Sequence, residues 1–583
     1  MDHIAPSVRR RQVLGGLGAM GTAAVAGCSE RLWSRVEAPP PEQVSLTVKT
    51  LPADVDSFAA KLSSRLTENL REVGIDATHE PIREAELYRV VLLERDYDMF
   101  IVRHSGLDDY DAIRSLLHSR FVGEQGWQNP FHYSDVTTDD KLNTQLTQDG
   151  TSRRETLFQL YEHLIETTPY SVIAYPHHLA LARADVGISD PPRSTIEYLE
   201  ILGDRPSTDD REVGLRVGLF GQDLTDRLNP IVVDLTDVDE ILDLIYDPLV
   251  RRTTEDDVHW LAESIEWNED DGGLRATITL REGLSWHDGE PLDADDVAFT
   301  ITFLKDTSLG EVEAGVPAPR YRGRQTLIES TRVLDSRTVQ YRFDDVSKEV
   351  GKRVMTIPIL PKHIWEPKSE LVGEHQTEAL VWDNDEPIGS GLFRVDEETS
   401  ETEMTLEPFE DHALLAAESD GFPASLTGIS SLDAIQFRIS PNLGSAVESL
   451  QDGEIDIVGQ RLSAEDLDAV SDEDEISFLT RPTESFYMMG FNAQRPDLTN
   501  PHFRTVLSRL IDRPYIVQTI FANYAEPATR VSSRFGVRPG EWDGPDSSTL
   551  PEFPGSDGAI DEAQVRDVFQ EIGYRYEDGE LLS

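Results

Sequence analysis

Residues 97–103 read Tyr97-Asp98-Met99-Phe100-Ile101-Val102-Arg103, a short apolar run that ends in a charged residue. Upstream, residues 44–49 and 75–78 read as two further strands. Apolar residues recur at helical spacing from Phe58 to Leu70 and again over 84–94. Strands that alternate with helices predict a parallel sheet, so the predicted fold class is α/β. In such sheets ligands bind beyond the carboxyl ends of strands, which places the expected site after Val102.

Downstream of residue 103, segments with helical spacing of apolar residues continue to alternate with strand-like segments. A helical run over 151–167 precedes a buried strand over 168–176. Acidic residues from Asp293 to Asp296 mark the start of a further helix, because carboxylates are favourable at a helix amino end.

Short segments between residues 211 and 513 resemble the family 5 extracellular solute-binding proteins, the peptide and nickel receptors of ABC importers. The longest, Leu280-Arg-Glu-Gly-Leu-Ser-Trp-His-Asp-Gly-Glu-Pro-Leu-Asp-Ala-Asp-Asp-Val297, is similar to the amino-terminal third of that family. Residues 44–190 instead resemble its carboxy-terminal lobe. The resemblance implies a two-lobed periplasmic-binding-protein-like fold (type II, cluster C) with a circularly permuted chain order.

The resemblance also implies how the chain is divided. The expected segments are a twin-arginine lipoprotein signal (1–28), a Pro-rich linker (29–43), the first part of the carboxy-terminal-type lobe (44–168), two parts of lobe I (169–252 and 389–483), the companion domain of lobe I (253–388) and the second part of the carboxy-terminal-type lobe (484–583). We therefore expect Val44 and Ser583 to lie close together in one lobe.

The first thirty residues predict export and a lipid anchor. Arg9-Arg10-Arg11 precedes a Gly/Ala-rich apolar segment that is too short to cross a bilayer, which needs about 20 strongly apolar residues. Val25-Ala26-Gly27-Cys28 resembles a lipobox, so Cys28 is the predicted lipid attachment site at the extracellular face of the membrane. The alternative is a signal peptide that is cut away. Cys28 is the only cysteine, which excludes an internal disulfide and a thiolate metal site.

The charge balance is strongly acidic. There are 53 Lys and Arg residues against 109 Asp and Glu residues, a net charge of −56. This balance argues against nucleic-acid binding, which requires the opposite sign. The charge is spread along the chain and resembles that of haloarchaeal, salt-adapted proteins, in which salt screens the self-repulsion. The alternative is an acidic secreted protein without salt adaptation.

The loop Arg103-His-Ser-Gly-Leu-Asp-Asp-Tyr110 is the best candidate binding motif. In peptide-binding relatives this loop carries an Arg, a Gly and an Asp followed by an aromatic residue, a spacing that Arg103, Gly106, Asp109 and Tyr110 fit, with Leu107 among them. The resemblance implies that Asp109 pairs with a peptide's α-ammonium group, because a buried ammonium requires an ionised partner. The alternative is a solvated loop acid.

Two further segments resemble cleft-lining parts of the family. Tyr246-Asp247-Pro248-Leu249 matches an edge segment that offers main-chain groups to an extended ligand. Its alternative reading is a helix end followed by a turn. Phe486 and Tyr487 are candidates for the opposite wall, with an aromatic core strand as the alternative.

Catalytic motifs are absent from the sequence: there is no Gly-x-Ser-x-Gly elbow, no phosphate loop and no His-Glu-x-x-His helix. No cofactor and no metal site are expected; His104 and His177-His178 are the residues that could bind a transition metal in the alternative reading. We expect a monomeric, non-enzymatic receptor that binds a di- or oligopeptide or a similar small solute, closes its lobes and delivers the solute to an ABC permease. The alternatives are a sensor that signals through a membrane partner, a nickel or oligosaccharide receptor, and a secreted hydrolase.

Overall fold

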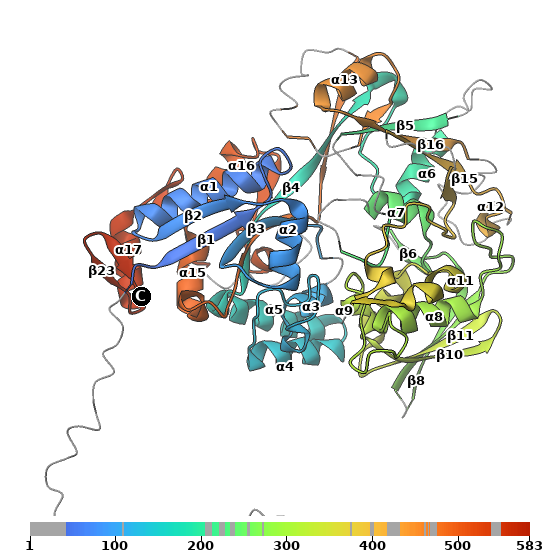
Figure 1. The fold of residues 1–583 in the computed structure, drawn as a ribbon, viewed down its shortest axis with the longest axis horizontal. Helices are drawn as coiled ribbons and strands as arrows, with labels where there is room; N and C mark the ends of the chain where they lie inside the picture. Colours follow the sequence, from blue (N-terminus) through green and yellow to red (C-terminus); the bar gives the residue numbers. More distant parts are fainter. Residues whose placement is uncertain are drawn as a thin grey trace, which may run out of the picture.

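The computed structural model describes residues 42–107, 110–204, 213–220, 228–233, 239–253, 257–270, 273–373, 376–396, 402–416, 432–459, 462–463, 466, 475–537 and 550–583. These residues form two lobes that lie side by side (Figure 1). We call residues 42–176 and 486–583 the terminal lobe, and residues 177–485 the central lobe. The α/β class predicted from the sequence is confirmed.

In the terminal lobe the strands follow the predicted βαβ pattern. Strand β1 pairs in parallel with both β2 and β3, and β19 lies between β3 and β4. The bounds of these strands are β1 Ser45–Thr50, β2 Asp76–Pro81, β3 Met99–His104, β4 Tyr170–Arg183 and β19 Phe486–Phe491. The strands predicted around residues 46, 76 and 100 are confirmed.

Helices cover both faces of this sheet. Helix α1 begins where Asp56 caps it by accepting from the amide of Ala59 at 2.9 Å, and its apolar face is buried. One apolar core lies under α1, and a second lies on the opposite face under α5. The bounds of the helices are α1 Ser57–Glu72, α2 Glu84–Tyr88, α3 Ile113–Leu117, α4 Val136–Leu146, α5 Gly150–Thr167, α15 Pro501–Arg509, α16 Arg513–Thr519 and α17 Glu562–Glu571, with a 3₁₀ turn, η10, over Ser532–Phe535.

The central lobe holds the rest of the large sheet and a smaller antiparallel sheet. Its strands in the large sheet are β5 Val213–Phe220, β14 Phe393–Val395, β15 Glu403–Pro408, β16 Ala434–Ser440, β17 Ile457–Val458 and β18 Ile476–Pro482. The smaller sheet has the order β10-β11-β9-β8, with β8 Ala262–Asp270, β9 Gly273–Leu280, β10 Ile328–Asp335 and β11 Thr338–Phe343. One apolar core runs continuously between the two sheets.

Helix α8 of the central lobe (Ala294–Lys305) begins at the predicted place. Asp293 is its N-cap, and Asp296 closes a capping box by accepting from the Asp293 amide at 3.1 Å. The other principal helices of this lobe are α6 Thr195–Asp204, α7 Asp239–Ile245, α9 Arg322–Gln325, α11 Lys362–Trp365 and α13 Leu443–Gln451.

Strand β4 belongs to both lobes. Its first residues, Tyr170 to Ala174, pair with β19 in the terminal lobe, whereas His177 to Arg183 pair with β18 in the central lobe (Figure 1). The segment between β18 and β19 crosses beside it, where the Thr483 hydroxyl donates to the carbonyl of Pro176 at 2.7 Å. The lobes are thus connected by two adjacent strands of one sheet.

Both ends of the described chain lie in the terminal lobe. The Val44 amide donates to the carbonyl of Leu581 at 2.9 Å, and the Ser583 amide donates to the carbonyl of Glu42 at 3.1 Å. The prediction that the two ends of the folded core are close is therefore confirmed. The permuted chain order itself stays a prediction.

The signal segment, the Pro-rich linker up to residue 41 and Cys28 lie outside the described residues. Along the part of the chain that the structure describes, no helix combines the length and the apolar character that crossing a membrane requires.

The adjacent ends allow a direct test of chain order. In one variant, a linker of about five residues joins Ser583 to Glu42, and new chain ends are opened between Asp204 and Val213. We expect this variant to fold with nearly the wild-type thermal midpoint, because the new ends interrupt no described helix or strand. Circular dichroism and calorimetric unfolding provide the measurement. A control with the same joint but opened at Pro176, inside β4, should not fold. If the first variant does not fold, the prediction that this fold tolerates a permuted chain order is contradicted.

Candidate functional site

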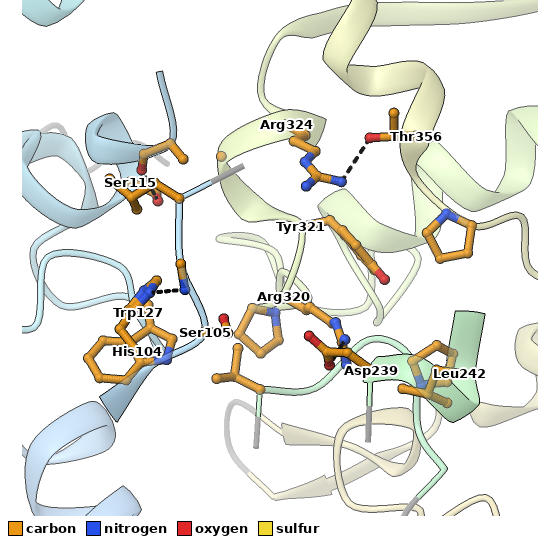
Figure 2. A pocket seen from close by; sticks show the side chains of 18 of the residues that line it. His104, Ser105, Ser115, Trp127, Asp239, Leu242, Arg320, Tyr321, Arg324 and Thr356 are labelled. Atoms are coloured by element: carbon orange, nitrogen blue, oxygen red, sulfur yellow. Dashed lines mark hydrogen bonds and ion pairs between the residues drawn. The ribbon is translucent and has the colours of Figure 1, made fainter. Parts of the chain in front are cut away.

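A cavity of about 510 Å³ lies where the two lobes meet (Figure 2). This volume is in the range of small-molecule sites. The terminal lobe contributes Arg103, His104, Ser105, Gly106, Leu107, Ala112, Ser115, Leu116, Trp127 and Gln128. The central lobe contributes Arg193, Ser194, Pro230, Val233, Asp239, Leu242, Asp243, Tyr246, Pro248, Pro319, Arg320, Tyr321, Gly323, Arg324, Arg353, Thr356, Pro358 and Glu484.

The terminal-lobe wall begins at the carboxyl end of β3, as the sheet rule predicts. The ring of His104 stacks on Phe486 with 5.0 Å between centroids and meets the edge of Trp127 at 4.9 Å. His104 Nδ1 accepts from the amide of Gly106 at 3.0 Å, which fixes the loop that follows the strand. Three aromatic rings therefore hold this wall in place.

Gly106 is required by the geometry of that loop. Its φ is +123°, a conformation that side chains rarely adopt. A Cβ there would lie 2.9 Å from the backbone carbonyl of Glu484, so the cavity loop packs directly against the segment that links β18 to β19. The loop and the inter-lobe connection are thus in contact at the floor of the site.

The opposite wall is built around Tyr321, which lies between two cavity-lining arginines (Figure 2). The guanidinium carbons of Arg320 and Arg324 lie 5.9 and 5.8 Å from its ring centroid. Arg324 also donates to Thr356 Oγ1 at 2.9 Å, and Arg320 forms an ion pair with Asp239. Cation–π contacts and these polar bonds fix the orientation of both guanidinium groups.

The described part of the cavity lining carries charges of both signs. The cationic side chains are Arg103, Arg193, Arg320, Arg324 and Arg353, and the anionic ones are Asp239, Asp243 and Glu484. Cations thus outnumber anions here, although acids outnumber bases about twofold in the whole chain. A ligand with a positive and a negative end finds a partner for each in such a lining.

Asp247 lies behind this wall and does not line the cavity. It is fully buried, with Oδ1 accepting from Trp260 Nε1 at 2.7 Å and from Arg251 at 2.9 Å, and Oδ2 bonded to His412 Nε2 at 2.9 Å. Burial acts to raise the pKa of Asp247, but His412 and Arg251 hold it below its ordinary value. The side chain therefore fixes the fold next to Tyr246.

His287 holds the end of α7 from which Tyr246 continues. Its Nε2 donates to the carbonyl of Gly391 at 2.9 Å, and its Nδ1 accepts from the amide of Gly389 at 3.2 Å, which defines a neutral ring. A Cβ on Gly389 would lie 2.0 Å from the carbonyl of Ile245. The Gly389-Ser-Gly391 segment thus passes as close to α7 as glycine permits.

A continuous chain of polar side chains crosses from one lobe to the other beside the cavity. Arg353 of the central lobe pairs with Asp111 of the terminal lobe at 2.6 Å, and Asp111 accepts from Gln145 at 2.5 Å. Arg153 donates to Gln145 Oε1 at 3.0 Å and pairs with Glu349 of the central lobe at 2.8 Å. Apart from Glu349, these side chains are buried. The described conformation is therefore one in which the lobes are in close contact.

A third ion pair between the lobes extends this contact. Arg322 donates to both carboxylate oxygens of Glu124, at 2.5 and 2.9 Å. Nearby, Gln128 donates to the carbonyl of Pro319 at 2.9 Å.

Four of the residues predicted from the sequence line the cavity, namely Arg103, Gly106, Leu107 and Tyr246. Asp109 lies outside the described residues.

The other predicted residues are placed elsewhere. Phe486 and Tyr487 belong to the two apolar cores of the terminal lobe, where the Tyr487 hydroxyl donates to Asp56 at 3.0 Å. Tyr110 packs against one of these cores, and Asp247 is enclosed by its three partners. These four side chains are not part of the described cavity lining, and their contact with a ligand stays a prediction.

Sequence reasoning missed the wall formed by Arg320, Tyr321 and Arg324, and it missed Glu484. These residues come from segments far from the Arg103 loop, and only the packing of the two lobes brings them to it. The one available signal was the cluster of aromatic and basic residues over 320–324.

A family model described as "Bacterial extracellular solute-binding proteins, family 5 Middle" matches residues 258–581. The chain therefore belongs to the family 5 extracellular solute-binding proteins, as the resemblance implied. These proteins are extracellular receptors of transport systems. The match runs in one linear order and does not extend to residues 44–190, whose resemblance to the carboxy-terminal lobe stays a prediction.

Individual relatives are similar over part of their length. The chain is 25% identical over 326 residues to the "Oligopeptide-binding protein AppA" of Bacillus subtilis, which covers 55% of this chain and 52% of that protein. It is 23% identical over 288 residues to a putative ABC transporter peptide-binding protein of Brucella ovis, covering 49% of this chain and 48% of the relative. The chain thus spans about half the length of the curated relatives it matches.

Among solved structures, AppA of Bacillus subtilis in complex with a nonapeptide is 21% identical, with a TM-score of 0.44 over 63% of this chain and 65% of that chain.

The neutral histidines predict how stability depends on pH. Burial lowers the pKa of His287 and of His178, which bonds to the carbonyl of Gly459 at 2.9 Å, to about 4. Between pH 6.5 and 4 only the unfolded chain binds these protons, so stability is lost as the pH falls through this window, by about 3 kcal/mol for each residue. Urea unfolding of wild type and His287→Gln at pH 7 and pH 4.5 provides the measurement.

We expect His287→Gln to be less stable than the wild type at pH 7 but to lose less of its unfolding free energy between pH 7 and pH 4.5. Replacement of the exposed His259 by Gln is the control and should leave the acid loss unchanged. An equal acid loss in wild type and His287→Gln would show that His287 does not contribute.

Proposed function

We propose that this chain captures a peptide in the cavity between its lobes and delivers it to an ABC permease at the outer face of the cell membrane. The observation that carries the proposal is the cavity itself: a receptor of this family presents a volume of about 510 Å³ enclosed by both lobes and lined by charges of both signs. A peptide with free ends is zwitterionic and suits such a lining. The curated relatives named above are described as peptide-binding proteins.

In this proposal the lobes close on the solute by bending at β4 and at the β18–β19 segment. The ion pairs Arg353–Asp111 and Arg153–Glu349 form only when the lobes approach each other, so they favour the closed state. The closed form would be the one that the permease recognises.

The membrane attachment follows from the amino-terminal segment. We propose export by the twin-arginine route and lipidation of Cys28, with residues 29–43 as the spacer below the first described strand. The acidic composition supports a salt-adapted protein outside the cell.

The alternatives are weaker on the residues described. No group of three or more His, Cys, Asp or Glu side chains that suits a metal ion is found in the described ranges, which disfavours a nickel site. A hydrolase is disfavoured because the sequence carries none of the nucleophile motifs of such enzymes. A sensor would use the same cavity, and only its membrane partner would differ.

Two acids are candidates for the partner of the peptide's α-ammonium group. Asp109 is the residue that the family resemblance indicates, and Glu484 lines the cavity next to Gly106. Replacing the true partner with its amide leaves the buried ammonium unpaired, at a cost of about 2–5 kcal/mol. This corresponds to a loss of affinity of about thirtyfold to several-thousandfold.

Calorimetric titration in molar salt tests this assignment with a free tripeptide and its amino-acetylated form. We expect Asp109→Asn to weaken the free peptide far more than the acetylated one, with Asp96→Asn, an exposed acid of the same lobe, as the control. If Glu484→Gln shows this selective loss instead, Glu484 is the partner of the ammonium group, and the proposal of a peptide receptor still holds. Peptides that do not bind the wild type, or equal losses for both forms, would contradict a peptide receptor.

A further inference from the structure

A second cavity lies inside the terminal lobe, where α5, the start of β4, α15 and η10 meet. It is about 10 Å³, room for one water-sized sphere. Its polar lining comes from Thr168, Ser171, Thr505, Ser508, Arg509 and Arg534. None of these residues lines the ligand cavity, so the two sites are separate. We call it the arginine cavity.

Arg534 is the unusual side chain in this cavity. It is 9% exposed, and within the described part of the chain its guanidinium makes no hydrogen bond and no ion pair. Burial lowers its pKa to about 10, which still leaves the group charged at neutral pH. A buried cation without a partner is costly, because it loses its hydration and gains nothing in return.

Arg513 lies close enough to Arg534 for the two positive charges to repel each other. It is buried and donates only to neutral groups: the carbonyls of Val172 and Ser508, at 2.9 and 3.1 Å, and Ser171 Oγ at 2.8 Å. Because Ser171 accepts this bond, its own O–H remains a donor toward the cavity. The described surroundings therefore hold three positive charges, those of Arg509, Arg513 and Arg534, beside hydroxyl and apolar groups.

Some of the other buried arginines in the described residues have acidic partners. Arg353 pairs with Asp111, and Arg251 pairs with Asp243 and Asp247. The chain carries 109 acidic residues, yet the described lining of the arginine cavity includes none. Buried Arg95 and Arg504 also lack an acid but donate to backbone carbonyls, whereas the Arg534 guanidinium has no such acceptor among the described residues.

We propose that the arginine cavity binds one halide ion, chloride in salt-rich surroundings, between the guanidinium of Arg534 and the hydroxyl of Ser171. A cavity with room for one water-sized sphere suits a monatomic anion better than an oxyanion. The ion would connect η10, the start of β4 and α15, all of which meet there. The net charge of −56 repels anions at low ionic strength, so uptake requires salt to screen that field.

The consequence is that part of the salt requirement is specific to the anion. Chloride and gluconate at the same ionic strength screen equally, but only chloride fits the cavity. We expect the unfolding equilibrium constant of the wild type to fall by up to tenfold for each tenfold rise in chloride, at constant total ionic strength made up with gluconate.

Arg534→Met should lose this chloride dependence and should be as stable as the wild type, or more stable, in gluconate alone, because the buried unpaired charge is gone. Arg504→Met is the matched control in the same lobe. Arg504 is buried, and its guanidinium nitrogens donate to the carbonyls of Leu498 at 2.5 Å, of Thr168 at 2.9 Å and of Thr167, so its loss should destabilise the protein equally in both salts.

Diffraction from wild-type crystals grown in bromide gives a test that does not depend on any variant folding. An anomalous peak beside Arg534 is expected. The proposal is overturned if no peak lies in the cavity, or if wild type and Arg534→Met respond equally to the exchange of chloride for gluconate.

Discussion

The structure depends on one strand that is shared by two lobes. Strand β4 is buried along nearly all of its 14 residues and pairs with β19 in one lobe and with β18 in the other. Because backbone hydrogen bonds continue across the boundary, the lobes cannot separate without loss of the sheet, yet only two adjacent strands connect them. This arrangement permits bending about a narrow line. It also fixes the place of the cavity, whose loop after β3 packs against the β18–β19 segment at Gly106.

Buried ion pairs and hydrogen bonds cross the contact between the lobes, which bears on how the lobes could open. Asp111 and Arg353 are almost fully buried where the lobes meet. Taking both charges out of water costs much of what their attraction returns, so the pair is a weak source of stability by itself. In the proposed mechanism the charges regain hydration when the lobes part, and the solute supplies the remaining free energy for closure. A receptor that must release its solute benefits from such a balance.

The sequence predicted local elements well and long-range partners poorly. The alternating periods gave β1, α1, β2 and β3, and the acids at Asp293 and Asp296 gave the start of α8, because these signals are local. The resemblance places Asp247 among the candidate ligand-binding residues, and no local pattern reveals that Trp260 and His412 enclose its side chain.

The cavity wall around Tyr321 was missed for the same physical reason. It reaches the Arg103 loop only through the packing of two lobes, and no periodicity in one segment records that approach. What the family resemblance did supply was the loop after β3, where Arg103, Gly106 and Leu107 line the cavity. The rule that ligands bind beyond the carboxyl ends of strands indicates the same loop, because it depends on topology alone.

Closure of the lobes on a solute is the central claim, and the distance between them measures it most directly. Spin labels at the exposed Arg154 and Lys348, each changed to Cys with Cys28 replaced by Ser, lie on opposite sides of the contact between Gly150 and Glu349. Pulsed electron resonance should give a short, narrow distance distribution with bound peptide and a longer, broader one without it. The same distribution in both conditions would contradict the account.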